Sequence, residues 1–339
     1  MMAVYNGLPY LPHALNSILG QTLSDFEFVI VNDCSTDRTA DVIRGIGDPR
    51  IRLIENRENL NQTRSLNRGL EEVRTPFVAR MDADDLSHPR RLDLQMDFLY
   101  RHPTAAVVGS NTRWINESGE LIGNWDRPMR DVGLKWAQLH SCQVAGGSVL
   151  FRTAVIRDRL GGYDSSFRFS QDWELWSRVH GLGLELANVS EYLLDVRTHA
   201  NACSLVHQET ARAEDDQIRR MYRERVLGPS DGAPDWFERI QELISRRQDD
   251  PKNRLDLLNL LHDRFCDRYP AARSDAEVRR EVSKQYFQVL SHTDFQHWAT
   301  SRDTLARALR HTRSDRFIYE AVRWAVSRSL DRTVRKVFR

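Results

Sequence analysis

The sequence predicts an α/β fold with a mainly parallel central sheet and helices on both of its faces, followed by a helical C-terminal extension. Up to about residue 110, strand-like apolar runs alternate with amphipathic helical patterns, which is typical of a parallel sheet. From about residue 205 the chain is highly charged and reads as helical. We therefore expect one domain over residues 1–204, with halves at 1–110 and 111–204, and a helical region over 205–339.

The first half should contribute three strands and three helices. We expect the strands at residues 26–31, 51–54 and 76–79, and the helices at residues 11–19, 40–46 and 63–73. Asp33 follows the first of these strands, and Asp82 follows the last. Because ligands gather where parallel strands end at their carboxyl termini, both carboxylates should share one rim of the sheet.

The second half has a different pattern. A hairpin should run from Thr112 to Trp125 and turn at Glu117-Ser118-Gly119. Ser170 should begin an amphipathic helix that Gly181 ends. Further strands are expected at residues 147–151, 184–189 and 192–198, and a linker at residues 229–234.

Composition and charge exclude several classes of protein. The 339 residues carry 49 basic and 48 acidic side chains, a net charge of +1, so no global field attracts nucleic acid. No apolar run of about 18 residues predicts a transmembrane helix, and no secretory leader is visible. The four cysteines lack metal-ligand or disulfide spacing, which favours reduced thiols and a cytoplasmic location.

Three carboxylates, those of Asp82, Asp84 and Asp85, stand within four residues directly after a predicted strand. They repel one another unless a cation or hydrogen-bond donors compensate. Mg²⁺ and Mn²⁺ prefer such oxygen ligands, and substrate phosphate oxygens commonly complete their coordination. The spacing therefore fits a metal site of the D-x-D type, and it also fits a solvated turn or a helix cap.

Five segments carry a resemblance that extends over roughly residues 1–200. They are Tyr5-Asn6-Gly7, residues 17–22, Asn32-Asp33-Cys34-Ser35-Thr36-Asp37, residues 79–85 and Pro89-Arg90-Arg91-Leu92. In this order and at this spacing they resemble the family 2 glycosyltransferases, which have the GT-A fold. The resemblance implies a nucleotide-diphosphate sugar donor that Tyr5 and Asn6 help to bind, with Asp33 at its nucleobase. It also implies that Asp82 and Asp84 lie at the ribose, the diphosphate and a bound Mg²⁺ or Mn²⁺.

Two later segments resemble the acceptor side of the same family. They are Gly161-Gly162-Tyr163-Asp164 and residues 170–176. The resemblance implies that Asp172 is the general base and that Trp173 and Trp176 shape the acceptor pocket. A base is needed because an acceptor hydroxyl is a weak nucleophile until a carboxylate takes its proton. The alternative is that Asp172 is only a helix N-terminal carboxylate, which the helix dipole favours.

Other side chains have two interpretations each. His199 matches a family position near the metal and the diphosphate, but a lone histidine at a strand end is often structural. Arg80 can hold a phosphate, or it can pair with Asp82 or Asp85. We expect three tryptophans to lie in the core rather than at the surface as platforms for sugars: Trp114, Trp125 and Trp136.

The resemblance implies an inverting, metal-dependent glycosyltransferase that acts on a carbohydrate or lipid-linked acceptor in the synthesis of a cell-surface polysaccharide or lipopolysaccharide. One alternative is a catalytically inactive module that binds a nucleotide or a sugar. A nucleotidyltransferase is another, although Tyr5-Asn6-Gly7 is not the glycine-rich, basic phosphate loop that such an enzyme requires.

The two ends of the sequence carry further expectations. Only Met1–Val4 precede Tyr5, which is shorter than the first central strand of the family, so we expect unpaired backbone, poor solubility or weak donor binding. At the other end, residues 323–339 read as a basic amphipathic helix. Such a helix can dock peripherally on the anionic inner face of a membrane, or it can pack on the protein with its arginines outward.

Overall fold

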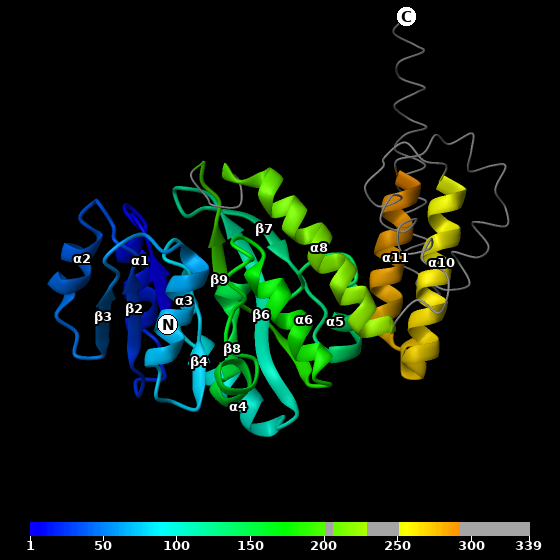
Figure 1. Ribbon diagram of the computed structural model, residues 1–339, viewed down its shortest axis with the longest axis horizontal. Helices are drawn as coiled ribbons and strands as arrows, with labels where there is room; N and C mark the ends of the chain where they lie inside the picture. The colour runs from blue at the N-terminus through cyan, green and yellow to red at the C-terminus, as the bar shows by residue number, and fades with distance from the viewer. Residues whose placement is uncertain (201–205, 229–250, 292–339) are drawn as a thin grey trace, which may run out of the picture. The chain divides into compact units, whose positions relative to one another are not determined.

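The computed structural model of the chain describes residues 1–200, 206–228 and 251–291 (Figure 1). Its contacts divide into two compact units, Met1–Val226 and Leu227–Arg339. Both sheets lie in the first unit, which confirms the predicted α/β class. Among the described helices, none is both long and apolar enough to cross a membrane.

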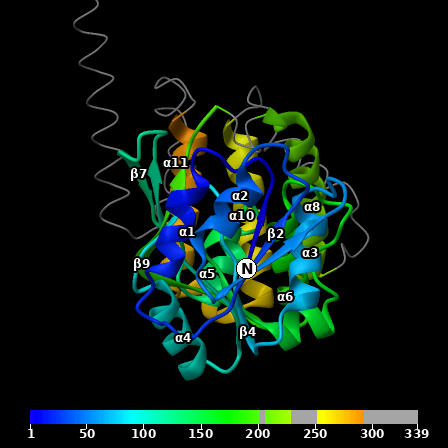
Figure 2. The ribbon, with the colours of Figure 1, turned by 90° about the vertical axis from the view of Figure 1, so that its left-hand side faces the viewer.

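The first sheet is parallel throughout and has the order β1–β2–β3. Its strands are β1 (Met2–Val4), β2 (Phe28–Asn32) and β3 (Ile51–Glu55), and its helices are α1 (Leu11–Leu19), α2 (Thr39–Ile46) and α3 (Gln62–Glu72). Every residue of β2 is buried because helices cover both of its faces (Figure 2). Phe28 and Ile30 pack with α1 and α2 on one face, whereas Val29 packs with α3 on the other.

The short strand β1 lies between β2 and β4 (Phe77–Ala79) and links the two sheets. The Met1 nitrogen donates to the Ala79 carbonyl at 2.8 Å, and Met81 N–H donates to the Met1 carbonyl at 3.1 Å. Met2 is fully buried there. The first strand is therefore as short as the sequence suggests, and the effect on solubility and donor binding stays a prediction.

The second sheet has the order β4–β8–β6–β9–β5, with β7 paired to β6. Its strands also include β5 (Leu86–Ser87), β6 (Ala105–Ile115), β7 (Leu121–Trp125), β8 (Leu150–Arg152) and β9 (Glu185–Arg197). β6 and β9 are parallel, whereas β4, β6 and β7 each take part in antiparallel pairs. The predicted hairpin is confirmed, and the two strands expected at 184–198 form the single strand β9 with irregular register.

Helices and short turns connect these strands. They are α4 (Arg91–Arg101), α5 (Asp131–Ala137), the 3-10 turn η1 (Gly146–Ser148), the π-helical segment η2 (Ala154–Arg159) and α6 (Gln171–Gly181). The strand predicted at residues 147–151 is therefore partly the turn η1, and β8 begins after it.

The tryptophans divide between core and surface. Trp136 is fully buried, as expected from the sequence. Trp114 and Trp125 remain 38% and 37% exposed, so the prediction that they lie in the core is wrong. Trp125 stands on β7, which lies outside the main strand order and has every residue exposed. Trp114 stands on β6 opposite Gly123 of β7, which has no side chain to cover it.

The boundary expected at residue 204 lies further along the chain. Helix α8 (Gln208–Leu227) belongs almost entirely to the first unit, because Glu214, Ile218 and Tyr222 are buried on its inner face. In the second unit, α10 (Pro251–Arg268), the 3-10 turn η3 (Pro270–Arg273) and α11 (Ala276–Ser291) confirm a helical C-terminal region. The expected linker at 229–234 and the basic helix at 323–339 lie outside the described residues.

Candidate active site

A pocket of about 800 Å³ opens where β1, β2 and β4 end at their carboxyl termini. Side chains from both halves of the first unit line it. Every residue that the sequence predicts for the site lines this pocket except Trp173 and Trp176. The shared rim expected for Asp33 and Asp82 is therefore confirmed.

The end of β2 places Asp33 at the inner wall of the pocket, where the residue is 2% exposed. Its Oδ1 accepts hydrogen bonds from Asn56 Nδ2 at 2.6 Å and from Leu60 N–H at 2.8 Å. Asp33 thus fixes the loop that follows β3. No described residue donates to its Oδ2, which leaves that oxygen for a ligand.

Tyr5 and Asn6 follow β1 on the opposite side of Asp33. The Asn6 Oδ1 accepts from Thr36 N–H at 2.8 Å and from Asp37 N–H at 3.3 Å, so its amide holds the loop after β2. Tyr5 is 49% exposed at the pocket surface. Asn6 therefore shapes the pocket through the backbone, whereas the Tyr5 ring is available for direct contact.

Asp82 is paired with Arg80, which resolves the alternatives for that arginine in this structure. Its Oδ1 accepts from Arg80 Nη2 at 2.5 Å and from Gln62 Nε2 at 2.9 Å. Burial raises the pKa of Asp82, the Arg80 charge opposes that change, and the neighbouring carboxylates of Asp84 and Asp172 reinforce it. The pair is a nearly neutral unit that holds the wall of the pocket.

Asp84 and Asp85 point to different partners. Asp84 Oδ2 lies 3.0 Å from His199 Nε2, and its side chain is 36% exposed. Asp85 is 4% exposed and accepts from Arg197 N–H at 2.9 Å, which ties the acidic loop to β9. Burial, followed by the charges of Asp84 and Asp82, holds the pKa of Asp85 well above its usual range. Asp85 is thus a structural group, whereas Asp84 remains accessible.

The pair Asp84 and His199 fits a divalent cation. It offers one carboxylate and one imidazole at the pocket wall, and Mg²⁺ or Mn²⁺ commonly completes its coordination with phosphate oxygens and water. Within the described part of the chain, no group of three or more His, Cys, Asp or Glu side chains forms a metal site by itself. A cation held by Asp84 and His199 would take its further ligands from phosphate oxygens and water.

Asp172 stands in the first turn of α6 on the other wall of the pocket. Its Oδ2 accepts from Gly146 N–H at 3.1 Å, and its Oδ1 accepts from Trp173 N–H at 2.8 Å. Burial raises the pKa of this carboxyl, and the Arg80 charge opposes that change. A carboxylate with a raised pKa accepts a proton more readily, so both its position and its basicity suit a general base.

The glycine pair of η1 separates the two walls, and the sequence reasoning missed it. A Cβ on Gly146 would lie 2.5 Å from Arg80 Nη1 and 2.8 Å from Asp172 Oδ2. A Cβ on Gly147 would lie 2.9 Å from Asp82 Oδ2. The absence of side chains here lets the backbone pass between the carboxylates. The signal in the sequence was the dipeptide itself, placed just before a strand.

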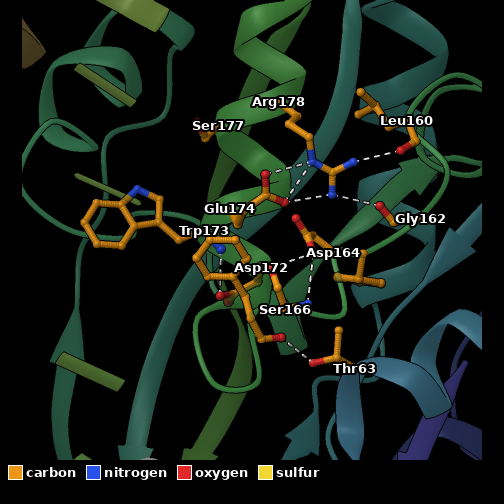
Figure 3. Close-up of polar contacts among 12 residues, drawn as sticks. Thr63, Leu160, Gly162, Asp164, Ser166, Asp172, Trp173, Glu174, Ser177 and Arg178 are labelled. Carbon is orange, nitrogen blue, oxygen red and sulfur yellow. Dashed lines mark hydrogen bonds and ion pairs between the residues drawn. The ribbon is translucent and has the colours of Figure 1, made fainter. Parts of the chain in front are cut away.

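Arg178 is part of α6 and ties this helix to the segment that precedes it (Figure 3). Its guanidinium donates to both oxygens of Glu174 at 2.9 and 2.8 Å, and to the carbonyls of Leu160 and Gly162 at 2.8 Å each. Gly162 has a φ of 82°, a left-handed conformation that favours glycine. The Gly161-Gly162 segment therefore serves to anchor α6 rather than to contact a substrate.

A second support, also missed, comes from α8. The buried carboxylate of Glu214 accepts the N–H groups of Arg168, Phe169 and Ser170 at 2.8, 2.9 and 2.9 Å. These three residues lead directly into α6 and Asp172. No sequence pattern marked Glu214, because it stands among many charged residues of one helix.

Trp173 and Trp176 lie in the core, so the prediction that they shape an acceptor pocket by contact is wrong. They are 1% and 0% exposed and do not line the pocket. Trp173 packs with Phe167 and Ile218, and Trp176 Nε1 donates to the Val144 carbonyl at 3.0 Å. Their spacing places them on the inward faces of α6, whereas Asp172 faces the pocket.

Comparison with curated proteins gives several matches that each cover about three fifths of this chain or more. The putative glycosyltransferase EpsE of Bacillus subtilis is 31% identical over 207 residues, which cover 60% of this chain and 73% of that protein. The O-antigen biosynthesis glycosyltransferase WbnJ of Escherichia coli is 32% identical over 206 residues, covering 59% of this chain and 78% of its own. An uncharacterized glycosyltransferase of Haemophilus influenzae is 29% identical over 230 residues, covering 65% of this chain and 71% of its own.

Solved structures share the fold at low sequence identity. S. aureus TarS residues 1–349, in complex with UDP-GlcNAc, superposes with a TM-score of 0.56 at 16% identity, over 85% of this chain and 88% of that one. The mannosyltransferase PcManGT of Pyrobaculum calidifontis, in complex with GDP-Man and Mn²⁺, gives 0.54 at 17% identity, over 93% and 86%. These similarities confirm the predicted GT-A architecture.

The sequence profile described as Glycosyl transferase family 2 matches residues 1–160, the region that supplies Asp33, Asp82, Asp84 and the glycine pair. The match ends before α6, so the role of Asp172 rests on the geometry of the pocket. Together with those relatives, this match shows that the chain belongs to glycosyltransferase family 2.

Proposed function

We propose that the protein transfers a sugar from a nucleoside diphosphate sugar to an acceptor hydroxyl, with inversion at the anomeric carbon. The observation that carries the proposal is one pocket with two different walls. Asp84 and His199 form a cation-binding pair on one wall, Asp172 forms a basic carboxylate on the other, and Gly146 lies between them. The ligands named for TarS and PcManGT, UDP-GlcNAc and GDP-Man, support this class of donor.

The chain's own residues divide the chemistry between them. Asp33 and Tyr5 bind the nucleoside, and the Arg80–Asp82 pair holds the wall beside the diphosphate. Asp84 and His199 would hold Mg²⁺ or Mn²⁺, which offsets the charge that develops on the departing diphosphate. Asp172 takes the proton of the acceptor hydroxyl as its oxygen bonds to the anomeric carbon.

The transfer is a single displacement at the anomeric carbon. The acceptor oxygen forms a bond to the anomeric carbon, and the bond from that carbon to the diphosphate oxygen breaks. The electron pair leaves with the nucleoside diphosphate, and the acceptor proton moves to Asp172. Because attack comes from the face opposite the leaving group, the anomeric configuration inverts.

Calorimetry with UDP, GDP, dTDP and CMP species, each with and without Mn²⁺, tests the donor half. We expect one nucleotide to bind, with an affinity that Mn²⁺ increases, and Asp84→Asn to abolish that increase. Asp172→Asn should keep nucleotide binding but lose transfer. Turnover by Asp172→Asn near that of the unaltered protein would remove this residue from the role of base. Nucleotide binding by the unaltered protein without any turnover would favour the inactive module.

The wider role in cell-surface polysaccharide or lipopolysaccharide synthesis also belongs to the proposal, supported by the O-antigen function in the name of WbnJ. Peripheral membrane contact through residues 323–339 stays a prediction. Sedimentation with anionic liposomes at low and at high salt tests it. Absence of binding at low salt would reject the membrane interpretation and favour packing of this segment on the protein.

A further inference from the structure

An exposed pair of tryptophans stands on the hairpin of β6 and β7 and lines the same pocket as Asp172. The ring centroids of Trp114 and Trp125 are 5.7 Å apart with an interplanar angle of 53°. Both side chains line the pocket, and more than a third of each is exposed. Large aromatic surfaces that stay in contact with water beside a catalytic pocket are typical of ligand-binding sites.

A glycine opposite Trp114 leaves open space beside the two tryptophan rings. Trp114 lies opposite Gly123, and Trp125 lies opposite Thr112, so both tryptophans project from the same face of the hairpin. A Cβ placed on Gly123 would meet no atom within 4 Å. The face therefore presents two rings beside an uncovered stretch of backbone, onto which a flat ligand can pack.

Arg127 lies against one of these rings and also lines the pocket. Its guanidinium carbon is 3.7 Å from the centroid of the Trp125 ring, and the residue is 3% exposed at the pocket wall. Its backbone N–H donates to Asn111 Oδ1 at 2.8 Å, which fixes its position. Its Nε has no hydrogen-bond partner, and its Nη1 has one long contact of 3.4 Å to the Cys142 carbonyl.

The charge of Arg127 is not neutralised by an ion pair within the described part of the chain. Burial lowers its pKa to about 10, while Cys142 and Asp172 act in the opposite direction, so the group remains a cation at neutral pH. Leaving a buried cation without a paired anion is unfavourable. An anionic group on a ligand would supply the missing charge in the bidentate geometry that arginine favours.

This arginine belongs to the acceptor side of the pocket. The charge of Asp172 acts on both Arg127 and Arg80. Arg80 also bonds directly to Asp82, whereas Arg127 has no carboxylate partner among the described residues. Arg80 is thus committed to the wall that carries Asp82 and Asp84. Arg127 is placed to receive a group that enters beside the general base.

We propose that Trp114, Trp125 and Arg127 form a subsite for an acceptor saccharide that carries a carboxylate or a phosphate. The apolar face of the sugar ring packs on the two indoles, and the anionic group pairs with the guanidinium. The inference rests on the proposed transferase function, because it takes the pocket beside Asp172 as the acceptor site. It adds that the acceptor is acidic, which the transferase activity alone does not require.

Binding of small saccharides to the full chain, saturated with the nucleotide and Mn²⁺ that it prefers, tests the subsite. The probes are methyl glucuronide against methyl glucoside, and glucose 6-phosphate against glucose, measured by saturation-transfer NMR titration. These two arms distinguish a carboxylate from a phosphate. We expect one acidic saccharide to bind about tenfold or more tightly than its neutral counterpart, a difference of about 1.4 kcal/mol.

Four variants separate the contribution of the Arg127 charge from that of the surface formed by the two tryptophans. Arg127→Gln should remove the preference for the acidic saccharide, and Arg127→Lys should keep only part of it, because a lysine lacks the planar fork. Trp125→Ala and Gly123→Val should weaken acidic and neutral saccharides alike, the first by removing the platform and the second by filling the space beside it. Arg101→Gln is the control, since Arg101 is exposed on α4 and pairs with Asp97.

The controls make the outcomes distinct. Each variant must keep the nucleotide affinity and melting temperature of the unaltered protein. If Arg127→Gln does not fold, Arg127→Lys still tests the charge and Gly123→Val still tests the platform. Equal binding of acidic and neutral saccharides, or no binding of any at millimolar concentration, would overturn the subsite while leaving the transferase proposal intact. Failure of the unaltered protein to bind any nucleotide would overturn the transferase proposal, and the subsite with it.

Discussion

Replacement of Glu214 by glutamine tests whether α8 positions the general base from outside the pocket. The carboxylate holds three backbone N–H groups in the segment that leads to Asp172. Glutamine has one acceptor oxygen, so one or two of these donors lose their partner and face an amide NH₂ group instead. At about 1–3 kcal/mol for each buried donor left unsatisfied, we expect a loss of roughly 2–4 kcal/mol in the free energy of unfolding.

The effect on catalysis should exceed the effect on donor binding. A shift of the 168–170 segment by about 1 Å would misalign Asp172 and lower kcat by roughly 100-fold. Tyr5, Asp33 and Asp84 stand on other loops, so the nucleotide Kd should stay within about twofold. Steady-state transfer assays and nucleotide calorimetry measure the two quantities separately.

A matched control is available on the same helix. Glu224 is exposed on α8, and Glu224→Gln should change neither quantity. If Glu214→Gln left kcat unchanged, or lowered kcat and nucleotide affinity to the same extent, the positioning role would be refuted. The second result would indicate general loss of structure rather than displacement of one segment.

Three further predictions concern the glycine pair, the partly buried histidine His140 and the cation-binding pair. Gly146→Ala should lower both the melting temperature and the transfer rate, because the added Cβ would lie 2.5 Å from Arg80 Nη1, whereas Gly45→Ala, with nothing within 4 Å, should lower neither. Burial, then the charges of Arg223 and Arg219, holds the pKa of His140 well below its usual 6.5. The unfolded chain therefore takes up a proton that the folded chain does not, so stability is present above pH 6.5 and is lost as pH falls below it, by up to about 1.4 kcal/mol per pH unit. In urea titrations at pH 7 and pH 5, His140→Gln should reduce this dependence, and an identical dependence would refute it. His199→Ala should raise the Mn²⁺ concentration needed for half-maximal nucleotide binding by roughly tenfold, and an unchanged requirement would exclude His199 as a ligand.

The parallel core and the donor rim could be predicted because their signals are local. The run Phe28–Asn32 is apolar and bounded by polar loops, and Asp33 and Asp82 follow strands that must end at the same edge. The roles of the three neighbouring carboxylates could not be separated in this way. Asp85 finds its partner on β9 at Arg197, and Asp84 finds His199, more than a hundred residues away in both cases.

The tryptophans were misjudged for a related reason. The helical spacing of Trp173 and Trp176 shows that they share an element, but it does not tell which side of that element meets the core. Trp114 and Trp125 stand in strand-like segments, and only the sheet order shows that β7 lies outside the main strand path. Long-range contacts decide burial in each case.

The exposed position of β7 also bears on how this protein and its relatives could differ. A strand that pairs with β6 alone, and whose residues all meet solvent, can change its side chains with little effect on the packing of the sheet. Asp82 and Asp85 on the donor wall have no such freedom, because Asp82 is tied to the buried Arg80 and Asp85 to the distant strand β9. Exchange of residues 116–125 between two relatives should therefore transfer a preference for one acceptor while leaving the nucleotide unchanged.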